Sequence, residues 1–382
     1  MNDPIDPADQ AGLELLDAAL GGLAQGNWTA DTARIAAAMT AAPSPAVKAR
    51  LANLLTHHHF TQGALGEALD SCEAWIAHAP QDVSARDSKG SILIRLGRWD
   101  DLIALTRARL ADEAANHRLH SALANAYWRK GDTARARGHG EQALILQDRE
   151  HGGSAPAPSS AVPPFDRSAK ACNVIAFSLY GSAAKYCDGA IRNAVAGHHV
   201  YPEWTCRFYH DASVPQAVLK RLAAHGAQVI QVDRLPAARF GTFWRFLVAD
   251  DPAVDRYLLR DCDACVSLRE RAAVEEWIAS GRHFHLMRDG FTHTDLILAG
   301  MWGGVRGALP PMGQGVIDWS RTGPFTRTAD QTFLRERLWA TIRQSLVAHD
   351  SCFQVLDGQP FPAAAEIPGP RVGEAVTSPP VT

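Results

Sequence analysis

Residues 254–263 read Val-Asp-Arg-Tyr-Leu-Leu-Arg-Asp-Cys-Asp, and this stretch is typical of a short buried strand that ends at two aspartates. A run of this length, rich in Tyr and Leu, favours an interior position in a sheet. Open α/β sheets bind ligands at the carboxyl ends of their strands. Because carboxylate oxygens suit Mg²⁺ or Mn²⁺, which in turn bind diphosphates, we predict a metal and diphosphate site at Asp261 and Asp263. The alternative is an ordinary solvated turn.

The same segment holds Cys262 and Cys265 in the C-x-x-C spacing. A zinc knuckle needs a second ligand pair, and no other pair has a suitable spacing. A thioredoxin-like site needs such a pair at a helix start, and nothing else in the sequence supports redox chemistry. We interpret the two residues as small buried thiols. The seven cysteines are scattered and odd in number, which indicates reduced thiols in a cytosol.

The composition excludes several classes of protein. The 382 residues carry 38 Lys+Arg against 41 Asp+Glu, a formal net charge of −3, so we expect no nucleic-acid partner. The acidic N-terminal residues are followed by no apolar run, which argues against a secretory signal. No window approaches the roughly 18 apolar residues of a membrane span. We therefore expect a cytoplasmic protein with no transmembrane segment.

Residues 1–150 are rich in Ala, Leu and Arg, which predicts a helical domain. Gly63, Gly97 and Gly131 recur at intervals of 34 residues in it. Over residues 15–148 this pattern resembles the tetratricopeptide repeat, a helix hairpin whose glycine makes the turn and whose arrays present a concave surface. The repeats are expected to bind a protein partner or acceptor chain, or a second copy of the chain. A helical extension that only stabilises the enzyme is the equal alternative.

The composition changes twice after the repeats. Residues 151–168 are rich in Pro, Gly, Ser and Ala, which is typical of a linker. Residues 169–365 alternate short apolar strands with helices, which predicts a largely parallel α/β sheet covered on both faces. Residues 366–382, with four prolines among them, are predicted to be a disordered tail.

Seven segments of the α/β region carry a resemblance to glycosyltransferases of the GT-A fold. They are residues 243–246 (Phe-Trp-Arg-Phe), 260–263 (Arg-Asp-Cys-Asp), 269–274 (Arg-Glu-Arg-Ala-Ala-Val), 285–289 (His-Leu-Met-Arg-Asp), 299–303 (Ala-Gly-Met-Trp-Gly), 330–334 (Asp-Gln-Thr-Phe-Leu) and 349–351 (His-Asp-Ser). The region looks like uncharacterised bacterial proteins of that type. The order of its parts is also similar to that of retaining, glycogenin-like enzymes, although their Asn-x-Gly is absent.

The resemblance implies roles for particular residues. Asp261, Asp263 and the late His349 would be ligands of Mn²⁺ or Mg²⁺. Asp330 and Gln331 would lie near the donor sugar and its anomeric carbon. The donor would be a nucleotide sugar, with a UDP-hexose as the expected compound. Its base and ribose would lie at the end of the first strand, among Ser178, Tyr180, Gly181 and Lys185, unless these residues only cap the next helix.

Other residues are candidates for the same site. Guanidinium suits phosphate geometry, so the expected phosphate contacts are Arg245, Arg260 and Arg288, each with a structural ion pair as its alternative. Trp302 could stack on a sugar face. An inverting transferase needs a carboxylate to deprotonate the acceptor hydroxyl, and Asp289 is then the candidate base. Its alternative is a residue that caps the loop, and whether the enzyme retains or inverts stays open.

Together these features predict a metal-dependent glycosyltransferase that moves a hexose to a glycan, a lipid-linked sugar or a protein. The first alternative is a non-catalytic, repeat-based adaptor with a degenerate glycosyltransferase domain. The second is another nucleotide-dependent enzyme, such as a nucleotidyltransferase. That enzyme would need a Gly-rich phosphate loop after the first strand, and residues 179–182 (Leu-Tyr-Gly-Ser) are too poor in glycine.

Overall fold

The computed structural model describes residues 5–24, 32–232, 241–324, 326, 328–363 and 370–375. The chain divides into two compact units. The first comprises residues 1–115 and 125–133, and the second comprises residues 116–124 and 134–382. Each unit is described separately below.

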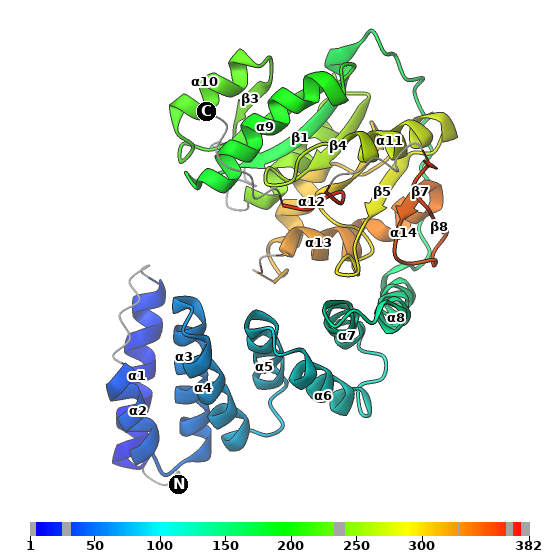
Figure 1. Ribbon diagram of the computed structural model, residues 1–382. Helices are drawn as coiled ribbons and strands as arrows, with labels where there is room; N and C mark the ends of the chain where they lie inside the picture. Colours follow the sequence, from blue (N-terminus) through cyan, green and yellow to red (C-terminus); the bar gives the residue numbers. More distant parts are fainter. Residues whose placement is uncertain are drawn as a thin grey trace. The chain divides into compact units, whose positions relative to one another are not determined.

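The first unit is built of helices joined by short turns (Figure 1). Its helices are α1 (Pro7–Ala24), α2 (Thr32–Ala41), α3 (Pro45–Gln62), α4 (Leu65–His78), α5 (Val83–Leu96), α6 (Trp99–Leu110) and the C-terminal part of α7 (His117–Arg129). Gly63, Gly97 and Gly131 follow α3, α5 and α7 with φ angles of 77°, 68° and 81°. Only glycine adopts this left-handed conformation without strain, so it ends one helix and starts the turn to the next. The helical-repeat prediction is confirmed.

The second unit holds one mixed sheet of eight strands in the order β3-β2-β1-β4-β6-β5-β7-β8. Every neighbouring pair is parallel except those of β6, which runs antiparallel to β4 and β5. The strands are β1 (Asn173–Leu179), β2 (Thr205–His210), β3 (Gln228–Gln231), β4 (Arg256–Arg260), β5 (Phe284–Arg288), β6 (Met301–Val305), β7 (Leu346–Asp350) and β8 (Gly358–Gln359). The stretch that was expected to be a buried strand is β4, and all five of its residues are buried.

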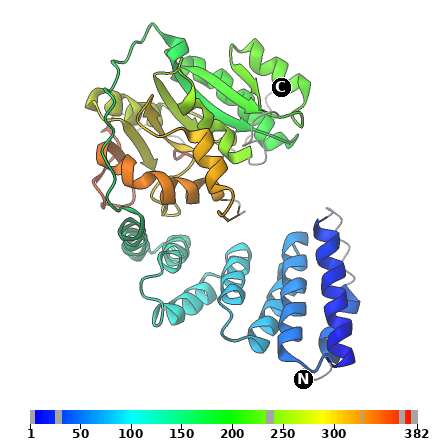
Figure 2. The same cartoon turned by 180° about the vertical axis from the view of Figure 1, so that it is seen from behind.

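Helical segments cover both faces of the sheet (Figures 1 and 2). The helical segments from residue 133 onward are α8 (Thr133–His151), η1 (Lys170–Cys172), α9 (Ala184–Val200), α10 (Gln216–Ala224), η3 (Gly241–Asp250), α11 (Leu268–Ser280), α12 (Met312–Trp319), α13 (Ala329–Phe333), η4 (Leu334–Leu338), α14 (Trp339–Ile342) and η5 (Arg343–Ser345). Central strands of such a sheet are buried on both sides, which explains why β1 and β4 lack the alternation of a half-exposed strand. None of the described helices is both long and apolar enough to cross a membrane.

Helix α8 packs within the second unit, although its sequence belongs to the repeat pattern. Gly140 stands where the repeat family usually has a large apolar residue, and a Cβ there would lie 2.0 Å from the Phe353 ring. The missing side chain therefore makes room for Phe353. Asp148 of α8 accepts a hydrogen bond of 2.7 Å from the Trp339 indole. Residues 134–151 of this helix therefore group with the sheet, as do residues 116–124.

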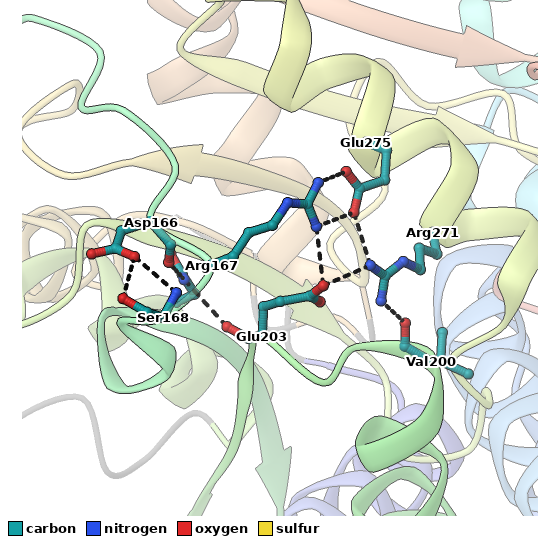
Figure 3. A network of polar contacts seen from close by, with 8 residues as sticks. Asp166, Arg167, Ser168, Val200, Glu203, Arg271 and Glu275 are labelled. Atoms are coloured by element: carbon teal, nitrogen blue, oxygen red, sulfur yellow. Dashed lines mark hydrogen bonds and ion pairs between the residues drawn. The ribbon is translucent and has the colours of Figure 1, made fainter.

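Residues 152–168 contain no helix or strand, yet they are attached to the sheet unit. Figure 3 shows Arg167 bonded to Glu203 at 3.0 Å and to Glu275 at 2.5 Å. Arg271 contacts the same two carboxylates at 3.0 Å. Each surface pair alone contributes little, but together they hold the segment against α11 and the loop before β2.

The predicted tail is described only in part. Residues 366–369 and 376–382 lie outside the described residues. Within residues 370–375, Val372 is 2% exposed and packs against Ala273, Met287 and Met301. Ala375 forms an isolated β-bridge with Ala264, just after the two aspartates of the β4 loop.

Candidate functional site

The carboxyl ends of β1 and β4 lie side by side. These strands are parallel, with Phe177 opposite Arg260, so the residues that follow each strand come out at the same edge of the sheet. The strand order runs from β1 to β2 on one side and from β1 to β4 on the other. A crevice at such a switch point is where open α/β sheets bind ligands. The fold therefore brings Ser178 and Tyr180 beside Asp261 and Asp263.

Arg245 of η3 joins three parts of this edge. Its guanidinium donates to Asp261, to the Arg260 carbonyl at 3.2 Å and to Asp330 of α13 at 2.9 Å. Its backbone N–H donates to the Ser178 hydroxyl at 3.0 Å. The Arg245 side chain is 5% exposed, and such a buried cation needs carboxylate partners. One guanidinium thus sets the positions of two carboxylates from distant parts of the chain.

The two carboxylates differ in exposure. The Asp330 side chain is 6% exposed, whereas that of Asp261 is 47% exposed. Burial raises the pKa of Asp330 to about 6, against the opposing attraction of Arg245. Asp330 can therefore exchange a proton near neutral pH, and Asp261 faces the solvent.

Asp263 lies on the open side of the loop, where the Lys185 ammonium at the start of α9 contacts it at 2.6 Å. A small cavity of about 60 Å³ lies between these groups, and Arg245, Asp261 and Asp263 line it together with Ser178, Tyr180, Tyr186, Thr242 and Cys262. Tyr180 and Tyr186 are 44% and 37% exposed, so two aromatic rings are accessible beside the acidic and basic groups.

Asn193 of α9 holds the aspartate loop in place, and the sequence reasoning missed it. This fully buried side chain donates to the Cys262 and Ala264 carbonyls at 3.4 and 2.7 Å and accepts from the Val266 N–H at 2.9 Å. A polar residue among Ala190, Ile191 and Ala194 was the available signal, because a buried amide needs partners. One helix turn earlier, a Cβ at Gly189 would lie 2.0 Å from the Cys262 carbonyl oxygen.

The surroundings of the two C-x-x-C thiols, Cys262 and Cys265, favour their protonated form. Burial raises the pKa of Cys262 well above its usual value and also raises the pKa of Cys265. The Cys262 thiol donates to the Ser178 carbonyl at 3.2 Å. Protonated thiols are poor nucleophiles and poor metal ligands. Cys262 is buried as predicted, whereas Cys265 is only partly buried.

Comparisons with known proteins identify no family for the chain. No protein-family model and no curated protein matches it. Among solved structures, it is similar to a mutant O-GlcNAc transferase from Thermobaculum terrenum, at 19% identity and a TM-score of 0.43 over 67% of this chain and 47% of that one. The chain thus spans about half the length of that transferase.

Two of the other similar structures are helical-repeat proteins. A tetratricopeptide repeat protein from Parabacteroides merdae matches at 17% identity and a TM-score of 0.34, over 37% of this chain and 55% of that one. MamA of AMB-1 matches at 20% identity and a TM-score of 0.32, over 37% of this chain and 74% of that one.

His349 does not join the two aspartates. It lies in β7, three strands from β4, and a strand spacing of about 4.8 Å separates the two strands by about 14 Å. Both of its ring nitrogens have protein partners: His285 at 3.1 Å, Glu276 at 2.6 Å and Gln359 at 3.0 Å. Within the described part of the chain, no three His, Cys, Asp or Glu side chains gather into a metal site. His349 is therefore not a third ligand beside Asp261 and Asp263, and metal binding by the two aspartates stays a prediction.

Arg260 and Arg288, both predicted to contact phosphate, lie in buried ion pairs instead. Arg260 bonds Glu270 at 3.1 Å, and Glu270 also accepts from the Tyr201 hydroxyl at 3.0 Å. Arg288 bonds Asp350 at 2.7 Å, with both side chains 0% exposed. Since neither guanidinium reaches the β1–β4 crevice, Arg245 is the arginine of the three that lines the cavity.

Two further candidates, Trp302 and Asp289, have surroundings other than expected. Trp302 is 1% exposed and packs against Phe246 and Tyr257, so it cannot stack on a sugar. Asp289 accepts two hydrogen bonds from Arg269, at 2.8 and 2.9 Å, and one from the Val372 N–H at 2.9 Å. These partners lower its pKa despite burial, which makes it a poor proton acceptor.

Two candidates lie at the edge of the site. The Gln331 N–H donates to the Asp330 carboxylate at 2.9 Å, so the residue helps to hold Asp330. Gly181 has a φ of 73°, and its N–H donates to the Ser213 hydroxyl at 2.6 Å, which fixes the turn after β1.

Proposed function

We propose that this chain is a glycosyltransferase that moves a hexose from a nucleotide sugar, with UDP as the carrier, to a glycan, a lipid-linked sugar or a protein. One observation carries the proposal: Arg245 ties the exposed Asp261 and the buried Asp330 together at the β1–β4 switch point, beside Asp263, Lys185 and accessible tyrosines. The resemblance to GT-A glycosyltransferases agrees with this arrangement. No Gly-rich loop for a triphosphate follows β1.

The donor would bind across the end of the sheet. Tyr180 and Tyr186 would stack on the base, while Lys185 and Arg245 would face the diphosphate, since both are cations near the aspartates. Mg²⁺ typically takes one or two protein carboxylates and completes its shell with phosphate oxygens and water. Asp261 and Asp263 fit that pattern, and such an ion would neutralise the leaving diphosphate.

Asp330 would act closest to the transferred sugar. In the reaction the bond from the anomeric carbon to the diphosphate breaks, a bond to the acceptor oxygen forms, and the acceptor hydroxyl loses its proton. A carboxyl with a pKa of about 6 is suited to take up that proton at neutral pH. Asp289 is not proposed for this role, because its hydrogen bonds from Arg269 and the Val372 N–H lower its pKa, whereas the pKa of Asp330 is raised.

The repeats would supply a docking surface. Helical repeats present side chains along a continuous face, which suits a protein acceptor, a partner protein or a second copy of the chain. This role stands apart from the chemistry at β1 and β4.

The test is a calorimetric titration of UDP and of GDP, with Mn²⁺ and then with EDTA. Asp263→Asn should abolish metal-dependent UDP binding. The matched control is Asp255→Asn, which removes a carboxylate from the opposite end of β4, where it pairs with Arg306. The control should bind UDP as the wild type does. If the folded wild type binds neither nucleotide, the transferase proposal fails and the non-catalytic adaptor replaces it.

A further inference from the structure

A second cavity lies in the sheet unit and is larger than the one beside the aspartates. Its volume is about 450 Å³, against about 60 Å³ for the first. Ligand pockets of proteins typically span about 300–1,000 Å³, so this one can hold a small molecule. Its walls come from the start of α7, from α8, from the loop after β5 and from α13 with the segments on either side of it.

The lining of this cavity is polar. Hydroxyl, amide and charged side chains face it, among them Ser121, Gln147, Asp295, Thr328, Thr332 and Arg335. His117 supplies the one aromatic ring among the described lining residues, and no Phe, Tyr or Trp faces the cavity. A ligand rich in hydroxyl groups, each of which both donates and accepts, matches such a surface best.

Two charged members of the lining, Arg335 and Asp295, are bonded to each other. Arg335 bonds Asp295 at 2.6 Å, and its side chain is 8% exposed. The Gln147 amide nitrogen donates to the Thr294 carbonyl at 2.6 Å. The Gln147 amide oxygen accepts from the Arg335 guanidinium at 3.5 Å. A rigid polar wall of this kind loses little entropy when it binds a ligand.

The cavity and the catalytic carboxylate lie on opposite faces of one short helix. Thr328 and Thr332 are four residues apart and share a face, with the Thr332 hydroxyl bonded to the Thr328 carbonyl at 3.2 Å. Asp330 lies between them in the sequence and contacts Arg245 on the other side. Because a helix with its side chains is about 10 Å across, a ligand in the cavity is too far from Asp330 to react there.

We propose that this cavity binds a saccharide and serves as a remote subsite for an oligosaccharide acceptor. Its role in acceptor binding rests on the transferase function proposed above, whereas saccharide binding itself does not. An acceptor of several sugar units would place one unit here and its reactive end near Asp330. Binding energy from such a remote contact can be used to orient the reacting hydroxyl.

Ligand-observed NMR tests the inference on the full-length protein with four linear trisaccharides: maltotriose, cellotriose, chitotriose and mannotriose. We expect at least one to bind. Ser121→Trp and Thr328→Trp fill the cavity from opposite walls, and each should weaken that binding by about tenfold or more, because the indole occupies the ligand's place. Ala134→Trp, at an exposed position of α8 outside the lining, is the control and should bind as the wild type does.

Titration of UDP with Mn²⁺ into the same variants separates the two proposals. Loss of trisaccharide binding with unchanged UDP binding supports both. If the wild type binds a trisaccharide that Ser121→Trp loses, but does not bind UDP, the saccharide site stands and the transferase function fails. If no trisaccharide binds the folded wild type, or if both filled variants keep the binding, the subsite inference is overturned.

Discussion

Gly300 lies so close to Asp261 that a Cβ at this glycine would be 2.0 Å from the Asp261 Oδ2 atom and 3.1 Å from its backbone nitrogen. Gly300 directly precedes β6, the antiparallel neighbour of β4. Only a residue without a side chain allows these two segments to meet at the carboxyl end of β4.

Gly300→Ala should therefore displace the Asp261 carboxylate. We expect UDP affinity to fall by about tenfold or more, which corresponds to about 1.4 kcal/mol. Overpacking should also cost about 1–3 kcal/mol in the free energy of unfolding. Calorimetry and urea unfolding measure the two effects.

The control for this variant is Gly138→Ala in α8, where an added Cβ meets no atom within 4 Å. That change should stabilise the helix by up to about 1 kcal/mol and leave UDP binding unchanged. Unaltered UDP binding by Gly300→Ala would show that Asp261 does not contact the donor.

Asn193→Ala should loosen the aspartate loop. It leaves the Cys262 and Ala264 carbonyls and the Val266 N–H without their partner, so we expect a loss of about 2–4 kcal/mol in the free energy of unfolding. UDP affinity should fall as well, because Asp263 lies within that loop.

Asn173→Ala is the matched control for Asn193→Ala. Asn173 is also a buried asparagine that donates to carbonyls, those of Asp166 and Glu203, but it lies at the amino end of β1. It should destabilise the protein to a comparable extent and keep UDP binding. Equal loss of UDP binding in both variants would mean that general destabilisation, and not the loop, explains the effect.

Glu270→Leu should leave the Arg260 charge buried and unpaired, at a cost of about 3–5 kcal/mol in the free energy of unfolding. Combining it with Arg260→Met and Tyr201→Phe removes all three polar groups and should restore most of that stability. Thermal and urea unfolding report the outcome. The triple variant should bind UDP like the wild type. A marked loss of UDP binding would indicate that Arg260 contacts phosphate.

The raised pKa of Asp330 predicts a pH dependence of stability with a defined sign. Its carboxyl has a pKa of about 6 in the folded protein and 3.8 as its ordinary value, so between these values the folded state holds a proton that the unfolded state lacks. The contribution of Asp330 to the free energy of unfolding is therefore most favourable below pH 3.8, and it is lost as the pH rises through about 6.

Asp330→Asn removes this titration. The stability of the wild type relative to the variant should fall by about 3 kcal/mol between pH 4 and pH 7, because each pKa unit corresponds to about 1.36 kcal/mol. Urea unfolding at several pH values checks this. A difference in the free energy of unfolding between wild type and variant that stays constant with pH would contradict a raised pKa. So would a difference that grows in favour of the wild type as the pH rises.

Much of the local structure could be predicted from the sequence because it depends on local rules. The glycines at 63, 97 and 131 recur at the helical-repeat period, and each takes a left-handed φ, which glycine adopts without steric strain. Helix α11 begins after Ser267, whose hydroxyl accepts from the Glu270 N–H, and such a cap is also a local feature. The run before Asp261 forms the expected strand.

The partners of charged residues depend on neighbours that are distant in sequence, and only the tertiary structure decided them. In the sequence, Arg260 and Arg245 are equally good candidates for phosphate contacts. In the structure, Arg260 forms an ion pair with Glu270, whereas Arg245 forms ion pairs with Asp261 and Asp330. His349 follows the expected order of motifs, but the insertion of β6 and β5 between β4 and β7 keeps it from the aspartates.

The helical repeats, the strand before Asp261 and the two aspartates that follow it were readable from the sequence, since periodicity and backbone preference act over a few residues. The structure decided which carboxylate is buried, which arginine meets it and which cavity lies beside them. Those properties follow from packing, because burial and charge pairing are set by atoms that the fold brings together from residues 178, 245, 261 and 330.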